Sequence, residues 1–255
     1  MLVNSKILLK KAQEGHYAIP SANVIDMESI KNQIQLAEKL GLPLIAAIAE
    51  SHLGSSISLE DAALVGRKYA AEASVPVVLH LDHGQSFETC KRAIDLGFTS
   101  VMIDASMKSF EENVETTRKV VEYAHARGVT VEAEIGHVAS NFDENDQEAL
   151  YTTAEEASAF AEQSGCDSLA ISIGTAHGVY KAKAIPEISF DSLAEIRQAT
   201  SVPLVLHGGS GSGDDNLSRC AKEGICTINI YTDIYLAAMK SLEEADASDY
   251  FQVRA

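Results

Sequence analysis

The sequence contains no apolar run that approaches the ~20 residues needed to cross a bilayer. Its opening stretch, MLVNSKILLKKAQEGH, also lacks the signal-peptide order of basic, then apolar, then small residues. These two absences predict a cytoplasmic protein with no membrane partner.

Basic side chains are scarce: 20 Lys and Arg stand against 37 Asp and Glu, which gives a formal net charge of −17. A field of this sign repels phosphate backbones, so nucleic acid and anionic membranes are not expected partners. An anionic substrate would therefore need a local binding site that offsets the overall negative charge, such as a metal ion or a group of backbone N–H donors.

Linkers and cysteine pairs are also absent. No Pro/Ser-rich segment or low-complexity tract divides the 255 residues, so we expect one domain spanning residues 1–255. The 4 cysteines include no C-x-x-C pair and show no regular spacing, which indicates reduced, packed thiols.

What the sequence does contain is an alternation of short β-branched runs with helical segments. The runs barely alternate in polarity, as is typical of parallel strands buried on both faces. Between them, apolar residues recur every three or four positions, and glycines stand where helices should stop. Eight such units predict an α/β fold, a (β/α)8 TIM barrel, rather than a doubly wound open sheet. The expected strands are 17–22, 43–49, 76–81, 100–104, 130–134, 168–173, 203–207 and 227–230.

The carboxyl-terminal ends of the expected strands carry most of the chemistry. In a barrel these ends meet at one mouth, where active sites are built. The opposite ends carry only turn sequences such as GLP, SVP and GVT. This asymmetry predicts an active site at the mouth, among Asn23, Glu50, Asp82, His83, Asp104, Glu134, His177, His207 and Asn229.

Three histidines at strand ends are each followed by glycine, in DHG, AHG and LHGG. Neutral imidazole is a favoured zinc ligand, and three protein ligands leave a position open for substrate. We therefore predict that His83, His177 and His207 bind one divalent metal ion. The remaining histidines lack this pattern: His80 is a candidate to orient a ligand, while surface or loop positions are expected for His16, His52, His125 and His137.

Asp82 directly precedes His83, and at a strand end the backbone can turn both side chains toward the pocket. A carboxylate beside a cation can act as a general base or can merely orient a ligand. The sequence leaves both roles open.

The segment HGGSGSGDD, residues 207–215, is a glycine-rich turn that leads from the seventh expected strand into a helix. The amides of such a turn, with the helix N-terminus, can form an anion site, and barrels commonly hold phosphate after strands seven and eight. Asn229 and Thr232 can supply further donors. The alternative is a surface loop with Asn and Thr as helix caps. Together, a metal site, a carboxylate and a phosphate site predict an enzyme that abstracts a proton next to a carbonyl group. Metal-assisted hydrolysis is the alternative reaction.

Six motifs resemble those of the class II, metal-dependent ketose-bisphosphate aldolases, in particular the tagatose- and fructose-bisphosphate enzymes. The resemblance is collinear from Leu2 to Leu242 and rests on PVVLHLDHG, SVMIDAS, VEAEIG, GTAHGVYK, VPLVLHGGSG and INIYTD. It implies a TIM barrel that reversibly cleaves a ketose phosphate or bisphosphate into dihydroxyacetone phosphate and an aldehyde. It also implies a homodimer or homotetramer.

The resemblance assigns roles to residues of the motifs. His83, His177 and His207 would bind the catalytic zinc, which stabilises the enediolate, and Asp82 would be the acid/base for the C4 hydroxyl proton. Glu134 and Asp104 match positions that can hold an alternative or second divalent ion, and Lys181 lies in the segment that matches the region of a monovalent Na⁺ or K⁺ ion. The residues that match the binding site for dihydroxyacetone phosphate are Gly178, Gly208, Ser210, Asn229 and Thr232. Asn23 is a further substrate-binding candidate.

The departures from the family pattern lie at the aldehyde end. Serine followed by EGA is usual where this chain has AESHLGSS from Ala49 onward, and Tyr231 stands where acid or alanine is common. Phe142 replaces the usual loop glutamate, which leaves Glu144 as a candidate acid/base. The usual terminal helix is expected to be missing or disordered after DASDYFQVRA. Two alternatives therefore stay open: a zinc barrel enzyme for another phosphorylated substrate, and a catalytically weak barrel serving as an assembly partner.

Overall fold

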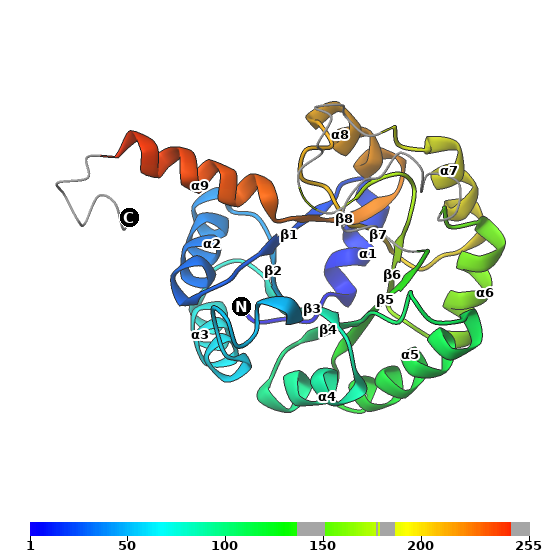
Figure 1. Cartoon of the computed structure of the whole chain (residues 1–255), viewed down its shortest axis with the longest axis horizontal. Coiled ribbons are helices and arrows are strands. Elements are labelled where there is room, and N and C mark those ends of the chain that lie inside the picture. The colour runs from blue at the N-terminus through cyan, green and yellow to red at the C-terminus, as the bar shows by residue number, and fades with distance from the viewer. Residues whose placement is uncertain (137–150, 177, 179–186, 246–255) are drawn as a thin grey trace.

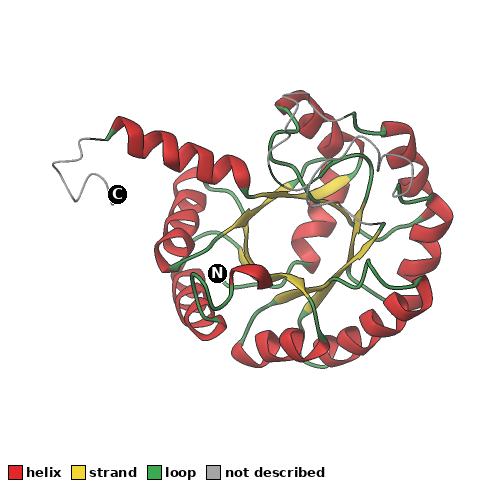
Figure 2. Ribbon diagram, in the orientation of Figure 1, coloured by secondary structure: helices red, strands yellow, loops and turns green. Residues whose placement is uncertain are grey.

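Eight parallel strands form a closed ring in the computed structural model of the chain, and helices surround that ring (Figure 1 and Figure 2). The structure describes residues 1–136, 151–176, 178 and 187–245. Each strand pairs with the next in sequence, and β8 pairs with β1 to close the barrel. The strands are β1 (Ile19–Asn23), β2 (Leu44–Ala49), β3 (Val77–Gly84), β4 (Ser100–Ile103), β5 (Thr130–Ile135), β6 (Ser168–Ile171), β7 (Leu204–Leu206) and β8 (Ile225–Ile230). The predicted TIM barrel is confirmed, and the open sheet is excluded.

The helices begin and end where local sequence supplies caps. A capping box precedes α6, where the Thr153 side chain accepts from Glu156 N and the Glu156 carboxylate accepts from Thr153 N. Gly41 and Gly97 end α2 and α4 in the left-handed conformation. The helices are α1 (Lys6–Gly15), α2 (Met27–Leu40), α3 (Leu59–Glu72), α4 (Phe87–Leu96), α5 (Phe110–His125), α6 (Ala154–Ser164), α7 (Phe190–Ala199), α8 (Asp214–Glu223) and α9 (Thr232–Glu244), with a 3₁₀ turn η1 (Glu50–His52).

Apolar side chains on the outer face of the barrel pack beneath the helices. Ile48, Leu79 and Val101 belong to one such cluster, and Leu169 and Leu206 to another. The described helices include none that is both long and apolar enough to cross a membrane. The inner face is different, because it carries polar and small residues that approach the carboxyl-terminal mouth, including Asn23, His80, Glu132 and Glu134.

Helix α1 closes the opposite end of the barrel. Its Leu8 and Leu9 pack with Ile19, Ile45 and Val78 at the amino-terminal ends of strands, and Figure 1 shows this helix behind the open centre of the ring. The bottom of the barrel is therefore filled by an apolar plug, while the mouth stays polar.

We predict that Leu9→Ala lowers the free energy of unfolding by about 2–5 kcal/mol, because it leaves a cavity in this plug. Leu9 is 2% exposed, whereas Ile7 on the same helix is 66% exposed. Ile7→Ala is the matched control and should change stability by less than about 0.5 kcal/mol. Urea unfolding followed by circular dichroism measures both, and equal losses would contradict the role of α1 as a plug.

Candidate active site

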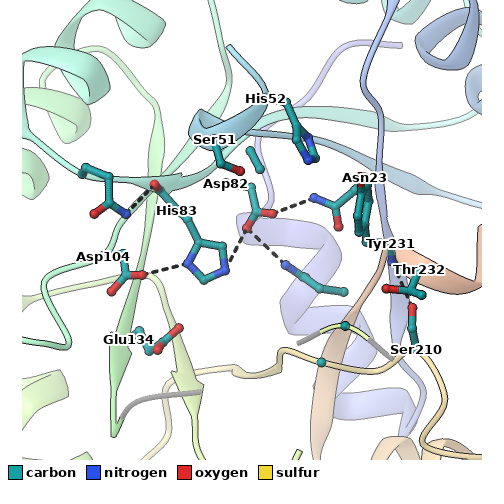
Figure 3. A pocket seen from close by; sticks show the side chains of 15 residues that line it. Asn23, Ser51, His52, Asp82, His83, Asp104, Glu134, Ser210, Tyr231 and Thr232 are labelled. Atoms are coloured by element: carbon teal, nitrogen blue, oxygen red, sulfur yellow. Dashed lines mark hydrogen bonds and ion pairs between the residues drawn. The ribbon is translucent and has the colours of Figure 1, made fainter. Parts of the chain in front are cut away.

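A cavity of about 330 Å³ opens at the carboxyl-terminal ends of the strands (Figure 3). It brings together most of the described residues that the sequence singled out. Its walls are formed by Asn23, Ala49, Ser51, His52, Asp82, His83, Gln85, Asp104, Glu134, Gly178, Gly208, Ser210, Asn229, Tyr231 and Thr232. His177, Lys181 and Glu144 lie outside the described residues, so their roles stay predictions.

An irregularity in β3 turns two consecutive side chains into this cavity. The pairing of β3 with β4 shifts register between Leu81 and Gly84, and His83 adopts a left-handed φ of 49°. Adjacent residues of a regular strand face opposite ways, whereas a bulge re-aims one of them. Asp82 and His83 both line the cavity as a result.

Gly84 is required by the packing behind this bulge. A Cβ at Gly84 would lie 2.6 Å from the Met102 carbonyl oxygen and 2.8 Å from Cys90 Sγ. A glycine directly after a ligand histidine can make room for a bound ligand. At Gly84 the close neighbour is instead the barrel itself.

His83, which lines the cavity, contacts the fully buried His207. His83 Nε2 lies 2.9 Å from His207 Nδ1, and the rings meet edge to face with centroids 4.7 Å apart. Asp104 Oδ2 lies 2.8 Å from His83 Nδ1, and Glu134 Oε2 lies 3.9 Å from His207 Nδ1. Two groups therefore have donor atoms mutually within 4.8 Å: Asp82 with His83 and His207, and His83 with Asp104 and Glu134.

This donor set fits a divalent metal of the zinc type. Two imidazole nitrogens bound to one tetrahedral zinc are separated by roughly 3.3 Å. His83 Nε2 and His207 Nδ1 are 2.9 Å apart, so a small outward movement would admit an ion between them. Carboxylates in contact with the far side of ligand histidines are typical of zinc sites. Asp104 on His83 and Glu132 on His207 stand in that position.

Asp82 is held as an ionised carboxylate. Burial raises its pKa, but the neighbouring imidazoles of His83, His207 and His80 and a hydrogen bond from Asn23 outweigh burial and bring the pKa to about 2. Asn23 Nδ2 donates to Oδ2 at 2.7 Å, and Asn229 Nδ2 donates to Oδ1 at 3.2 Å. Two amides from β1 and β8 thus fix the orientation of a charged carboxylate.

The two histidines titrate in opposite directions. Burial lowers the pKa of His83, but Asp82, the hydrogen bond to Asp104 and the charge of Glu134 outweigh it and raise the pKa to about 10. Burial and the positive charge of His83 lower the pKa of His207 to about 4. Without metal, His83 therefore carries a proton that His207 does not.

Glu132 was not singled out in the sequence. Its Oε1 lies 2.9 Å from His207 Nε2, and burial raises its pKa to about 7. It stands two residues before Glu134 in VEAE, so strand alternation already places both on the inner face. The sequence signal that could have identified Glu132 is therefore a second carboxylate on the same face of the strand as Glu134.

His52 also lies differently from its expected surface or loop position. It ends η1, is half-buried, and lines the cavity. Burial lowers its pKa against the opposing effect of Asp82, so the imidazole is neutral near pH 7. No pattern in the sequence distinguishes it from an ordinary loop histidine.

The predicted phosphate-binding residues gather on one side of the cavity. Ser210 Oγ accepts from Tyr231 N and Asp233 N at 3.1 and 3.2 Å, which leaves its hydroxyl hydrogen to donate. Thr232, the first residue of α9, lines the cavity, but in the described part of the chain the first turn of α8 does not. The helix N-terminus at this cradle is thus that of α9 instead of α8.

We predict that the affinity for zinc rises about tenfold per pH unit between pH 6 and 9, since an ion must displace the proton of His83. Below pH 10 His83 is protonated and competes with the metal, so raising the pH favours binding. Calorimetry in buffers of different ionisation enthalpy should count about one proton released per ion. Asp104→Asn removes a carboxylate that raises the pKa of His83, so the zinc affinity of this variant should stop rising at a lower pH. A zinc affinity that does not change with pH in the unmodified protein would contradict the role of His83 as a metal ligand.

Comparison with known proteins agrees with this geometry. The family model "Fructose-bisphosphate aldolase class-II" matches residues 3–254. Proteins named fructose-bisphosphate aldolase from Geobacillus stearothermophilus and Staphylococcus epidermidis are 40% identical over 252 residues and 39% identical over 251 residues, each alignment covering 97% of this chain and 87% of the relative. The crystal structure of the YdjI aldolase from Escherichia coli K12 superposes with a TM-score of 0.89 at 36% identity, covering 99% of this chain and 90% of that one. The resemblance carried by the six motifs is confirmed, and the chain belongs to the class-II fructose-bisphosphate aldolase family.

Proposed function

We propose that this aldolase cleaves the C3–C4 bond of a ketose phosphate, reversibly and with zinc, to give dihydroxyacetone phosphate and an aldehyde. The observation that carries the proposal is that Asp82 and His83, which are consecutive in sequence, both line one cavity and have donor atoms within 4.8 Å of a donor atom of His207. The reaction belongs to carbohydrate metabolism of the glycolytic type, and we place it in the cytoplasm.

The metal would be held by His83 and His207, with His177 as third ligand by family resemblance. Asp104 and Glu134 would hold an alternative or second divalent ion, since both have oxygens beside His83. When bound, zinc supplies a Lewis acid for the negative charge that develops on the donor half as the bond breaks. We also propose a Na⁺ or K⁺ ion near Lys181, a residue that lies outside the described part of the chain.

Asp82 would move the proton of the C4 hydroxyl. In the cleavage direction the ionised carboxylate accepts this proton, and in the addition direction it returns the proton to the new hydroxyl oxygen. Asn23 and Asn229 keep both carboxylate oxygens oriented during the transfer. Asn23 and Asn229 also line the cavity and can donate to substrate oxygens, and Glu144 is the candidate second acid/base.

The phosphate of the donor half would lie against Gly208, Ser210 and Thr232, with Gly178 opposite. A Cβ at Gly208 would lie 2.5 Å from the Ala176 carbonyl oxygen, so only glycine allows the two loops to meet there. Backbone N–H groups and hydroxyls bind phosphate without a lysine or arginine, which suits a chain of net charge −17.

We predict that Asp82→Asn lowers kcat for cleavage by about 10²–10⁴-fold, as expected for loss of a general acid/base. Zinc content, measured by mass spectrometry of the purified protein, should stay unchanged because the ligand histidines remain. Asp191→Asn, an exposed substitution on α7, is the matched control and should have no effect. Assaying both fructose and tagatose bisphosphates separates the two sugars, and cleavage that survives removal of all divalent metal would overturn the mechanism.

We also propose that the protein is a homodimer or homotetramer assembled through α9. This helix leaves the barrel as a projecting arm (Figure 1) and exposes Leu236, Met239 and Leu242, which recur at helical spacing on one face. An exposed apolar stripe of this kind is typical of an interface.

We expect Leu236→Glu combined with Met239→Glu to reduce the molar mass measured by light scattering toward that of a single 27.3 kDa chain. Lys240→Glu, on the same helix, is the matched control and should leave the mass of the assembly unchanged. A single-chain mass for the unmodified protein would refute the assignment of α9 as an interface.

A further inference from the structure

Two residues that depart from the family pattern contact each other at the rim of the cavity. The rings of His52 and Tyr231 lie with centroids 5.0 Å apart at an interplanar angle of 33°. Tyr231 in turn contacts Tyr235, with centroids 4.8 Å apart. We call His52, Tyr231 and Tyr235 the aromatic wall.

The aromatic wall lies where the acceptor half of the substrate must extend. In Figure 3, His52 lies on the opposite side of Asp82 from Glu134, which marks the candidate metal site, while Ser210 lies to the right, below Tyr231 and Thr232. If the donor phosphate is at Ser210 and Asp82 serves the C4 hydroxyl, the carbons beyond C4 run toward His52. His52 and Tyr231 both line the cavity, so a chain leaving Asp82 in this direction meets their rings.

No charge complementary to a second phosphate stands in this region of the described chain. The described residues that line the cavity include no lysine or arginine, and apart from His83 at the candidate metal site the charged members are the carboxylates Asp82, Asp104 and Glu134. The imidazole of His52 is neutral near pH 7, because burial lowers its pKa. Phosphate recognition ordinarily uses cations or converging N–H donors, whereas aromatic faces suit apolar surface.

Packing alone does not explain a histidine at position 52. Its Nδ1 atom is buried and has no hydrogen-bond partner among the described residues. A buried polar atom without a partner is destabilising, so a hydrocarbon ring would suit the fold better. A flat neutral ring that completes a binding surface accounts for both its place in the cavity and its contact with Tyr231.

We propose that His52 and Tyr231 form the acceptor subsite and select an uncharged polyhydroxy aldehyde, whose C–H face packs against the two rings. The preferred substrate is then a ketose 1-phosphate instead of a bisphosphate. This inference rests on the proposed function, because it assumes the donor position of dihydroxyacetone phosphate.

The first experiment uses the zinc-loaded protein in the addition direction with dihydroxyacetone phosphate. We expect kcat/KM for D-glyceraldehyde to exceed that for D-glyceraldehyde 3-phosphate by about tenfold or more, the discrimination typical of a pocket without a matching polar partner. Preference for the phosphorylated aldehyde would overturn the inference while leaving the proposed function intact.

The second experiment removes and restores the rings. His52→Ala and Tyr231→Ala should each lower kcat/KM for D-glyceraldehyde by about tenfold, whereas His52→Phe and Tyr231→Phe should retain most of it. Tyr17→Ala is the control, since Tyr17 is exposed and precedes β1 at the other end of the barrel.

Exchange of the C3 proton of dihydroxyacetone phosphate with solvent reports on the donor half alone. We expect this exchange to change by less than about twofold in the alanine variants, so that the loss is confined to the acceptor. Parallel losses of exchange and addition would overturn the acceptor role of the wall. Absence of exchange in the unmodified, zinc-loaded protein would refute the proposed function, and the inference with it.

Discussion

The left-handed backbone of His83 is the constraint on which the site depends. A regular strand would send Asp82 and His83 to opposite faces, one into the barrel and the other beneath the helices. The shift in register between Leu81 and Gly84 breaks this alternation, so both side chains reach the cavity. The φ of 49° at His83 shows that the backbone is locally strained there. Gly84 allows the strand to pack closely after this turn, because any side chain there would collide with Met102 and Cys90. The proposed base, Asp82, and the proposed metal ligand, His83, thereby occupy adjacent positions on one strand.

The polar interior of the barrel extends this arrangement. Burial alone would favour neutral carboxyls, yet the pKa of Asp82 falls to about 2 while the pKa of Glu132 rises to about 7. The difference arises from partners: Asp82 receives two amide donors and lies beside the protonated His83, whereas Glu132 lies beside the neutral His207. Two carboxylates on one barrel interior are thus suited to different tasks, one to proton transfer and one to orienting an imidazole.

The fold was predictable from the sequence because its signals are local and repeat eight times. Most of the strands are rich in Val, Ile or Leu, and glycine caps the C-terminal ends of α2, α4, α6 and α8. The positions of Asn23, Asp104, Glu134 and Asn229 followed directly, since strand ends in a barrel converge. The sequence did not reveal the contact between His52 and Tyr231, which are 179 residues apart and meet only after closure of the ring. Nor did it reveal the bulge in β3, because a left-handed histidine leaves no mark in the residue type.

Helix α9 belongs to two parts of the molecule at once. Tyr231 is its N-cap and Tyr235 lies in its first turn, and the Tyr235 hydroxyl donates to the backbone oxygen of Asn23 at 3.4 Å. Its outer turns carry the apolar stripe of the projecting arm. A helix is a stiff rod, so a tilt imposed on the arm is transmitted to the tyrosines at its base. The proposed interface between copies and the proposed aldehyde subsite would therefore be linked through one helix.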